Sequence, residues 1–109
     1  MLEKTMSQYS IKFSEECFGY SNVRNHNFMY LKQIERHCNA LLSTRKYLFL
    51  RDIYEMLGIP ITKDSCVVGW IFESDNKIGD NYVEFDIQED ANGIIFIDFN
   101  VDGDILDRI

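Results

Sequence analysis

The feature that most constrains the fold is a change of apolar spacing at Pro60. Before it, the stretch 47–60 has apolar residues at helical spacing, namely Phe49, Leu50, Ile53 and Leu57. Gly58 stands where helices commonly end in a left-handed residue, and Pro60 follows where a helix cannot continue. After Pro60, apolar and polar residues alternate, as they do in strands. The pattern predicts a helical half followed by a sheet.

An earlier helix is predicted to start at Asn25 or Asn27, since asparagine is a good N-cap. Its apolar residues form one stripe: Phe28, Leu31, Ile34, Cys38, Leu41 and Leu42. Polar residues of the same segment, among them Glu35 and Asn39, are expected to face away from the core. The polar residues 43–46 predict a short connection to the helix at 47–57, so the two helices should be antiparallel.

Three strands are predicted in the second half, at residues 66–72, 82–88 and 94–101. The middle segment alternates clearly, with Val83, Phe85 and Ile87 expected to point inward. Residues 89–93 predict the turn that follows. Asp102-Gly103 is a typical hairpin turn and would lead into a short terminal segment around Ile105.

The expected fold class is α+β, with two antiparallel helices packed on a small three- to four-stranded antiparallel sheet. A length of 109 residues fits one domain. It would comprise a partly irregular N-terminal arm (1–24), a helical part (25–60) and an antiparallel sheet (61–109). No run approaches the ~20 apolar residues that span a membrane, and the N-terminus lacks a signal-peptide pattern. We therefore expect a protein of the cytosol.

The charge is distributed unevenly along the chain. Residues 1–63 contain nine Lys/Arg and six Asp/Glu, a net charge of +3, whereas residues 64–109 contain two and twelve, a net charge of −10. Phosphates would be repelled by the second half, so direct binding of nucleic acid is not expected there. A basic protein partner, a cation or simple solubility would each account for such a charge.

Acidic side chains are expected to gather on the outer face of the sheet. Glu84 and Asp86 should project opposite the inward residues of their strand, and Asp98 and Asn100 should do the same next to them. Like charges on adjacent strands cost up to ~1 kcal/mol per opposed pair, so their clustering hints at a use. A solvated outer face is the commoner explanation. The candidate partner-binding residues are Tyr82, Glu84, Asp86, Asp98 and Asn100, together with the 73–81 loop.

The segment Asp98–Ile105 matches the first eight positions of a calcium loop, with Asp98, Asn100 and Asp102 as oxygen ligands and Gly103 at the bend. The glutamate expected at the twelfth position is replaced by Ile109. The preceding residues alternate as a strand, where a calcium loop of this type follows a helix. The hairpin is therefore the preferred interpretation, and these three residues remain weak candidates for a metal site.

Five blocks of the sequence, taken in order, are similar to the C-terminal domain of an uncharacterised family encoded by phages and prophages of Firmicutes. They are Asn39–Leu42, Tyr47–Pro60, Val68–Trp70, Gly79–Val83 and Asp98–Gly103. The resemblance covers roughly residues 13–109. It departs in lacking the hydrophobic N-terminal segment that members often carry, and in having Asp86 where glycine is common. The resemblance implies a genomic setting rather than a mechanism.

These observations favour a small acidic accessory protein that binds another protein and is not an enzyme, because no residue pattern assigns a nucleophile or a base. One alternative is an acidic inhibitor of a host defence nuclease or another basic nucleic-acid-binding protein, acting by mimicry of nucleic acid. A second alternative is a calcium-binding domain. The spacing of the cysteines and histidines matches no zinc site, and no cofactor is expected.

Overall fold

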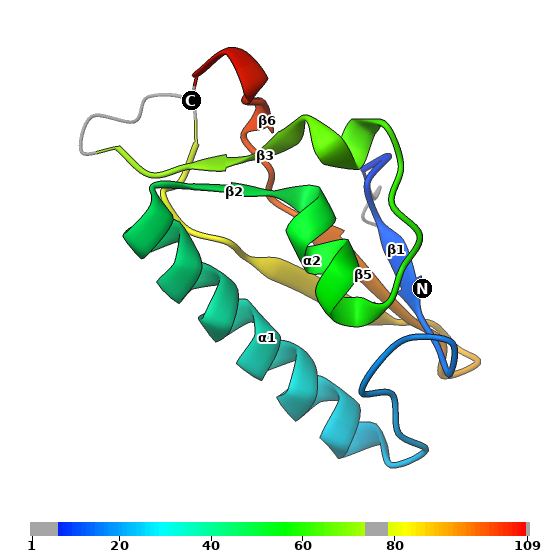
Figure 1. The fold of residues 1–109 in the computed structure, drawn as a ribbon. Coiled ribbons are helices and arrows are strands. Elements are labelled where there is room, and N and C mark those ends of the chain that lie inside the picture. The colour runs from blue at the N-terminus through cyan, green and yellow to red at the C-terminus, as the bar shows by residue number, and fades with distance from the viewer. Residues whose placement is uncertain (1–6, 74–78, 109) are drawn as a thin grey trace.

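The computed structural model describes residues 7–73 and 79–108. Within them the chain forms two α-helices and two three-stranded antiparallel sheets (Figure 1), which confirms the α+β class. The helices and strands follow in the order β1 (Ile11–Phe13), α1 (Arg24–Arg45), β2 (Tyr47–Phe49), α2 (Leu50–Leu57), β3 (Val68–Ile71), β4 (Phe85–Glu89), β5 (Ile95–Phe99) and β6 (Gly103–Asp104). Two 3₁₀ turns lie at Asp64–Cys66 and Leu106–Arg108.

Helix α1 is longer at its C-terminal end than predicted. Residues 43–45 continue the helix, and Lys46 alone ends it in a left-handed conformation, with its N–H donating to the Leu42 carbonyl. The expected N-caps do not cap it either, because Val23 is the N-cap residue. Asn27 is instead buried, and its amide group bonds the backbone of Ser21. At 22 residues, α1 is about 33 Å long.

The stretch predicted as one helix from residue 47 contains a strand and a helix. Tyr47–Phe49 forms β2, and α2 begins only at Leu50. The Asp52 carboxylate accepts a hydrogen bond from the Phe49 N–H at 3.0 Å, which fixes this change of conformation. The predicted end of α2 is confirmed: Gly58 adopts a left-handed conformation with φ of 71°.

The strands form two sheets rather than the single sheet predicted. One has the order β1-β5-β4 and the other the order β2-β3-β6. The N-terminal arm, expected to be partly irregular, contributes β1, which pairs with β5. Strand β3 pairs with β2 and β6, so it lies in a different sheet from β4. The turn at 89–93 is confirmed, and Asp90 N–H donates to the Ile94 carbonyl there.

The predicted hairpin at Asp102-Gly103 is wrong. The chain leaves β5 and crosses to the other sheet, where Gly103 pairs with Gly69. Asp102 assists the crossing because its N–H donates to the Gly69 carbonyl and its carboxylate accepts the Ile71 N–H at 2.9 Å. The second half of the sequence is therefore shared between two sheets.

Both helices and both sheets contribute to the main hydrophobic core. Its fully buried members include Phe13, Leu31, Leu42, Leu48, Ile53, Trp70 and Ile97. In Figure 1 the β1-β5-β4 sheet lies behind α2, and α1 runs along its β4 side. Among the described residues, neither helix combines the length and the apolar character needed to cross a membrane.

Candidate functional site

The acidic side chains predicted to gather on the sheet do lie together. Glu84, Asp86, Asp98 and Asn100 line a shallow depression of about 130 Å³; we call these four residues the acidic face. Asp86 and Asp98 are direct partners across β4 and β5. They point away from the core, since Phe85, Ile97 and Phe99 on the same strands are buried in it.

Asp98 is the most enclosed member of the acidic face, with only 7% of its surface exposed. Its carboxylate accepts hydrogen bonds from the backbone N–H and the hydroxyl of Ser7 and from the Phe99 N–H. This carboxylate therefore ties the start of the described chain to β5.

Asn100 joins the two sheets. Its Oδ1 accepts the indole N–H of Trp70 at 3.0 Å and the Glu84 N–H at 2.7 Å. Its Nδ2 donates to the Tyr82 carbonyl and to the Asp80 carboxylate. All these bonds are internal, so the side chain holds the acidic face in place rather than presenting a free group.

The two remaining acidic-face residues and Tyr82 are the accessible part of the predicted site. Glu84 is exposed, Asp86 is half-buried, and Tyr82 is 46% exposed. These three residues also line a second depression, of about 360 Å³, between β4 and α1. The central part of the 73–81 loop, residues 74–78, lies outside the described residues.

The three weak metal candidates are bonded to donors in different places. Asp98 accepts from Ser7, Asn100 from Trp70 and Asp102 from Ile71. Their segment runs from one sheet into the other, whereas a calcium loop folds around one central ion. In the described part of the chain, no three histidine, cysteine or acidic side chains are grouped as a metal site would require. The geometry gives the calcium alternative no support.

A row of hydrogen bonds joins α1 to the outer edge of the β1-β5-β4 sheet, which is β4 and the residues just before it. Asn39 accepts the Val83 N–H at 2.7 Å and donates to the Val83 carbonyl at 2.9 Å. One helical turn earlier, Glu35 accepts the Phe85 N–H at 2.7 Å. Lys32 lies 3.4 Å from the same carboxylate. We call this contact the closed end of the α1–β4 seam.

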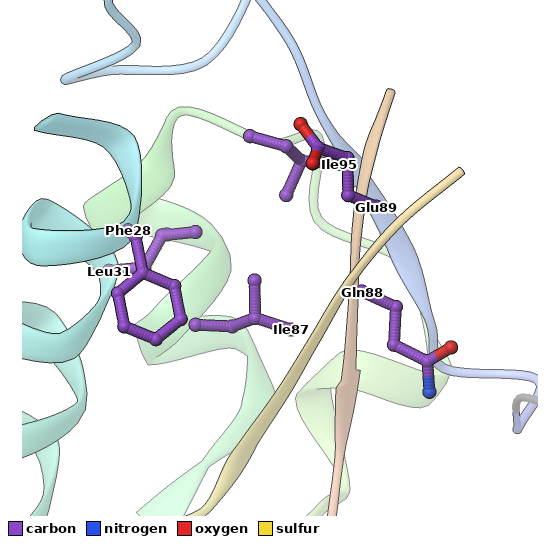
Figure 2. Close-up of a pocket in the computed structure, with 6 residues that line it drawn as sticks. All are labelled: Phe28, Leu31, Ile87, Gln88, Glu89 and Ile95. Carbon is purple, nitrogen blue, oxygen red and sulfur yellow. The ribbon is translucent and has the colours of Figure 1, made fainter. Parts of the chain in front are cut away.

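Farther along β4 the seam opens into a groove of about 250 Å³. Six residues line it: Phe28, Leu31, Ile87, Gln88, Glu89 and Ile95. Figure 2 shows the Phe28 ring and the side chains of Leu31 and Ile87 facing the space between α1 and β4. The Gln88 side chain points away on the other side of the strand. Phe28 was expected in the core but is 51% exposed.

The buried thiol of Cys38 lies behind the closed end. Burial, with smaller contributions from the carboxylates of Asp52 and Glu35, raises its pKa from the ordinary 9.0 to about 12. The thiol is therefore protonated at neutral pH and packs as an apolar group. Its sulfur lies 3.9 Å from that of Met56, which joins α1 to α2. This environment is that of a structural cysteine rather than a nucleophile.

The basic residues around β2 are engaged with neighbouring aromatic rings. Arg45 lies over Tyr47, Lys46 over Phe72, and Arg51 over Phe49, at 5.0, 4.8 and 5.3 Å from the ring centroids. Arg45 also lies 3.6 Å from the Asp52 carboxylate. These contacts serve the packing of the β2-β3-β6 sheet.

Sequence reasoning missed the importance of Glu35 and Asn39, which were expected to face away from the core. Both are half-buried and bond the edge of β4. Their spacing of four residues, on the border of the buried stripe that contains Cys38, is the signal that was available. It shows that both face one neighbour, but the neighbour itself comes from the fold.

A family model described as "Family of unknown function (DUF6353)" matches residues 2–109. The chain belongs to that family. Neither a curated protein nor a solved structure matches this chain significantly.

Proposed function

We propose that this DUF6353 chain is a small acidic protein that works by binding a basic protein partner and does not catalyse a reaction. The contact would involve Tyr82, Glu84 and Asp86, with Asp98 and Asn100 holding that surface in position. We also propose a phage or prophage accessory role in a bacterial cytosol, on the strength of the resemblance of the sequence blocks described above.

The observation that carries this proposal is the placement of the acidic face on the side of the sheet opposite the core. Helices cover the other side, and Asp86 and Asp98 remain opposed across two strands despite their like charge. An exposed tyrosine beside carboxylates suits a protein interface, where tyrosine is enriched and charges guide association.

A charge reversal at Glu84 tests this function. Glu84 is exposed, and it bonds Asn100 through its backbone N–H, so Glu84→Lys should leave the fold intact. The matched control is Glu15→Lys, which makes the same change at an exposed glutamate between β1 and α1. Wild-type and control proteins should retain the same partner from a host lysate, whereas Glu84→Lys should lose it.

The purified partner then gives a quantitative test by calorimetry. We expect Glu84→Lys to weaken binding about tenfold or more at low salt and by less at high salt, because salt screens exposed charges. Tyr82→Ala should weaken binding at both salt concentrations. Equal binding by the Glu84→Lys and Glu15→Lys proteins would refute the proposal.

A second candidate function is inhibition of a nucleic-acid-binding protein. It is favoured by the spacing of Glu84 and Asp86, which are two residues apart on one face of an extended segment, about 6.8 Å. The more enclosed Asp98 lies across from Asp86 and adds to the negative charge. Such a row of anions suits a cleft that binds phosphates. In this case the wild-type protein should displace DNA from the partner, and Glu84→Lys should not. Simultaneous binding of DNA and this protein would exclude mimicry.

A further inference from the structure

The β4 edge presents backbone groups that α1 does not reach. In an antiparallel pair, alternate residues point their N–H and C=O toward the partner strand and away from it. Phe85 donates to Glu35 on α1, so its groups point away from β5. Ile87, two residues later, therefore points its N–H and C=O the same way, out of the sheet edge.

The register between α1 and β4 explains why α1 makes no hydrogen bond to the backbone of Ile87. Four helical residues advance about 6 Å and two strand residues about 6.8 Å, so each contact is followed by another four residues along α1 and two residues along β4. Asn39 meets Val83 and Glu35 meets Phe85, which places Leu31 opposite Ile87. A leucine has no hydrogen-bonding group. Within the described residues, no hydrogen bond to Ile87 is made from that side.

The groove beside this edge has the chemistry for a side chain of a partner strand. Its wall is apolar where Phe28, Leu31 and Ile87 face the space (Figure 2). Glu89 is the charged residue among the six that line it. On the other face of the same strand lies Asp86. An added strand would therefore have an apolar residue directed into the groove and basic neighbours on the opposite face.

We propose that the edge of β4 at Ile87 binds an extended segment of the partner protein as an additional strand, with one apolar side chain in the groove and flanking Lys or Arg residues beside the acidic face. Main-chain bonds to Ile87 would give affinity, and the groove would select the side chain. Charge favours a basic partner over a second copy of this chain, whose β4 would oppose acidic residues to acidic ones. This inference rests on the proposed function and names the form of the partner.

The test uses a randomised decapeptide library displayed on its own messenger RNA and selected against the full chain. Two variants serve as matched baits. Phe28→Asp places a charge in the groove, and Met29→Asp makes the same change one residue along α1, at a side chain that is 66% exposed and does not line the groove. Enriched peptides are then synthesised with and without a methyl group on the central backbone nitrogen.

The proposal predicts enriched peptides with alternating apolar and basic residues that bind wild-type and Met29→Asp proteins alike and bind Phe28→Asp at least tenfold more weakly. Methylation of the backbone nitrogen should weaken them at least tenfold, since it removes a main-chain donor, and the bound peptide should slow exchange of the Ile87 amide. No enrichment, insensitivity to methylation, or protection of Ile87 by self-association would each overturn it. Loss of binding in Glu84→Lys alone would leave the proposed function standing and refute the groove.

Discussion

The two ends of the α1–β4 seam differ in whether α1 forms hydrogen bonds with the backbone along the edge of β4. At the closed end, Asn39 and Glu35 satisfy the backbone of Val83 and Phe85. At the open end, Leu31 and Phe28 stand opposite Ile87 and leave a groove. Unpaired strand edges invite association, so proteins usually cover or blunt them. The difference lies in the side chains of α1, which are hydrogen-bonding along one part of this edge and apolar along the other.

Removing the hydrogen bonds of the closed end should have a large effect on stability. Asn39→Ala removes both side-chain hydrogen bonds to the buried Val83, whose N–H and C=O lose this partner, and a third to the Glu35 carbonyl. We expect a loss of about 2–4 kcal/mol in unfolding free energy, measured by urea denaturation. The control, Asn25→Ala at an exposed position of the same helix, should cost under about 0.5 kcal/mol. If Asn39→Ala lost no more unfolding free energy than the control, the hydrogen bonds of the seam would contribute no stability.

Alkaline pH should lower the stability of the fold through Cys38, which lies behind the closed end. The pKa of Cys38 is about 12 in the folded protein, and its ordinary value is 9.0. The neutral, buried thiol therefore contributes its full stability below pH 9, and this contribution is lost as the pH rises toward 12. The expected loss at pH 10 is about 1.4 kcal/mol. Burial also raises the pKa of Tyr30 and Tyr54, which adds to the loss at higher pH. Urea denaturation between pH 8 and 10 measures it, and Cys38→Ala should flatten the dependence. An unchanged slope in this variant would contradict the assignment.

The smallest expected effect belongs to the open end. Phe28→Ala removes a half-exposed ring from the groove, and alanine favours the helix, so the unfolding free energy should change by less than about 0.5 kcal/mol. The contrasting variant is Leu31→Ala, which should cost about 2–5 kcal/mol because Leu31 is fully buried. Thermal or urea denaturation compares the two. A loss at Phe28 as large as at Leu31 would mean that the groove is part of the core.

The sequence was sufficient where the signal is local. The end of α2 at Gly58 needs only a glycine and a following proline, and the alternation of Val83, Phe85 and Ile87 identifies the inner face of β4. It was also sufficient to expect Asp86 and Asp98 on one face, which follows from alternation in two neighbouring strands.

The sequence was insufficient where the partner is distant. Strands β1 and β2 have three residues each, too short for a period to appear, and they form because β5 and β3 pair with them. Glu35 and Asn39 look like exposed helical residues until β4 is placed beside them, 44 to 50 residues later. The division into two sheets is decided by these long-range contacts.

Amide hydrogen exchange of the free monomer, followed by NMR, tests the difference between the two ends most directly. The amides of Val83 and Phe85 donate to Asn39 and Glu35, so they should exchange slowly, while the Ile87 amide, on the same strand edge, should exchange at least ~100-fold faster. Equal protection of Ile87 and Phe85 in a sample shown to be monomeric would contradict an open edge.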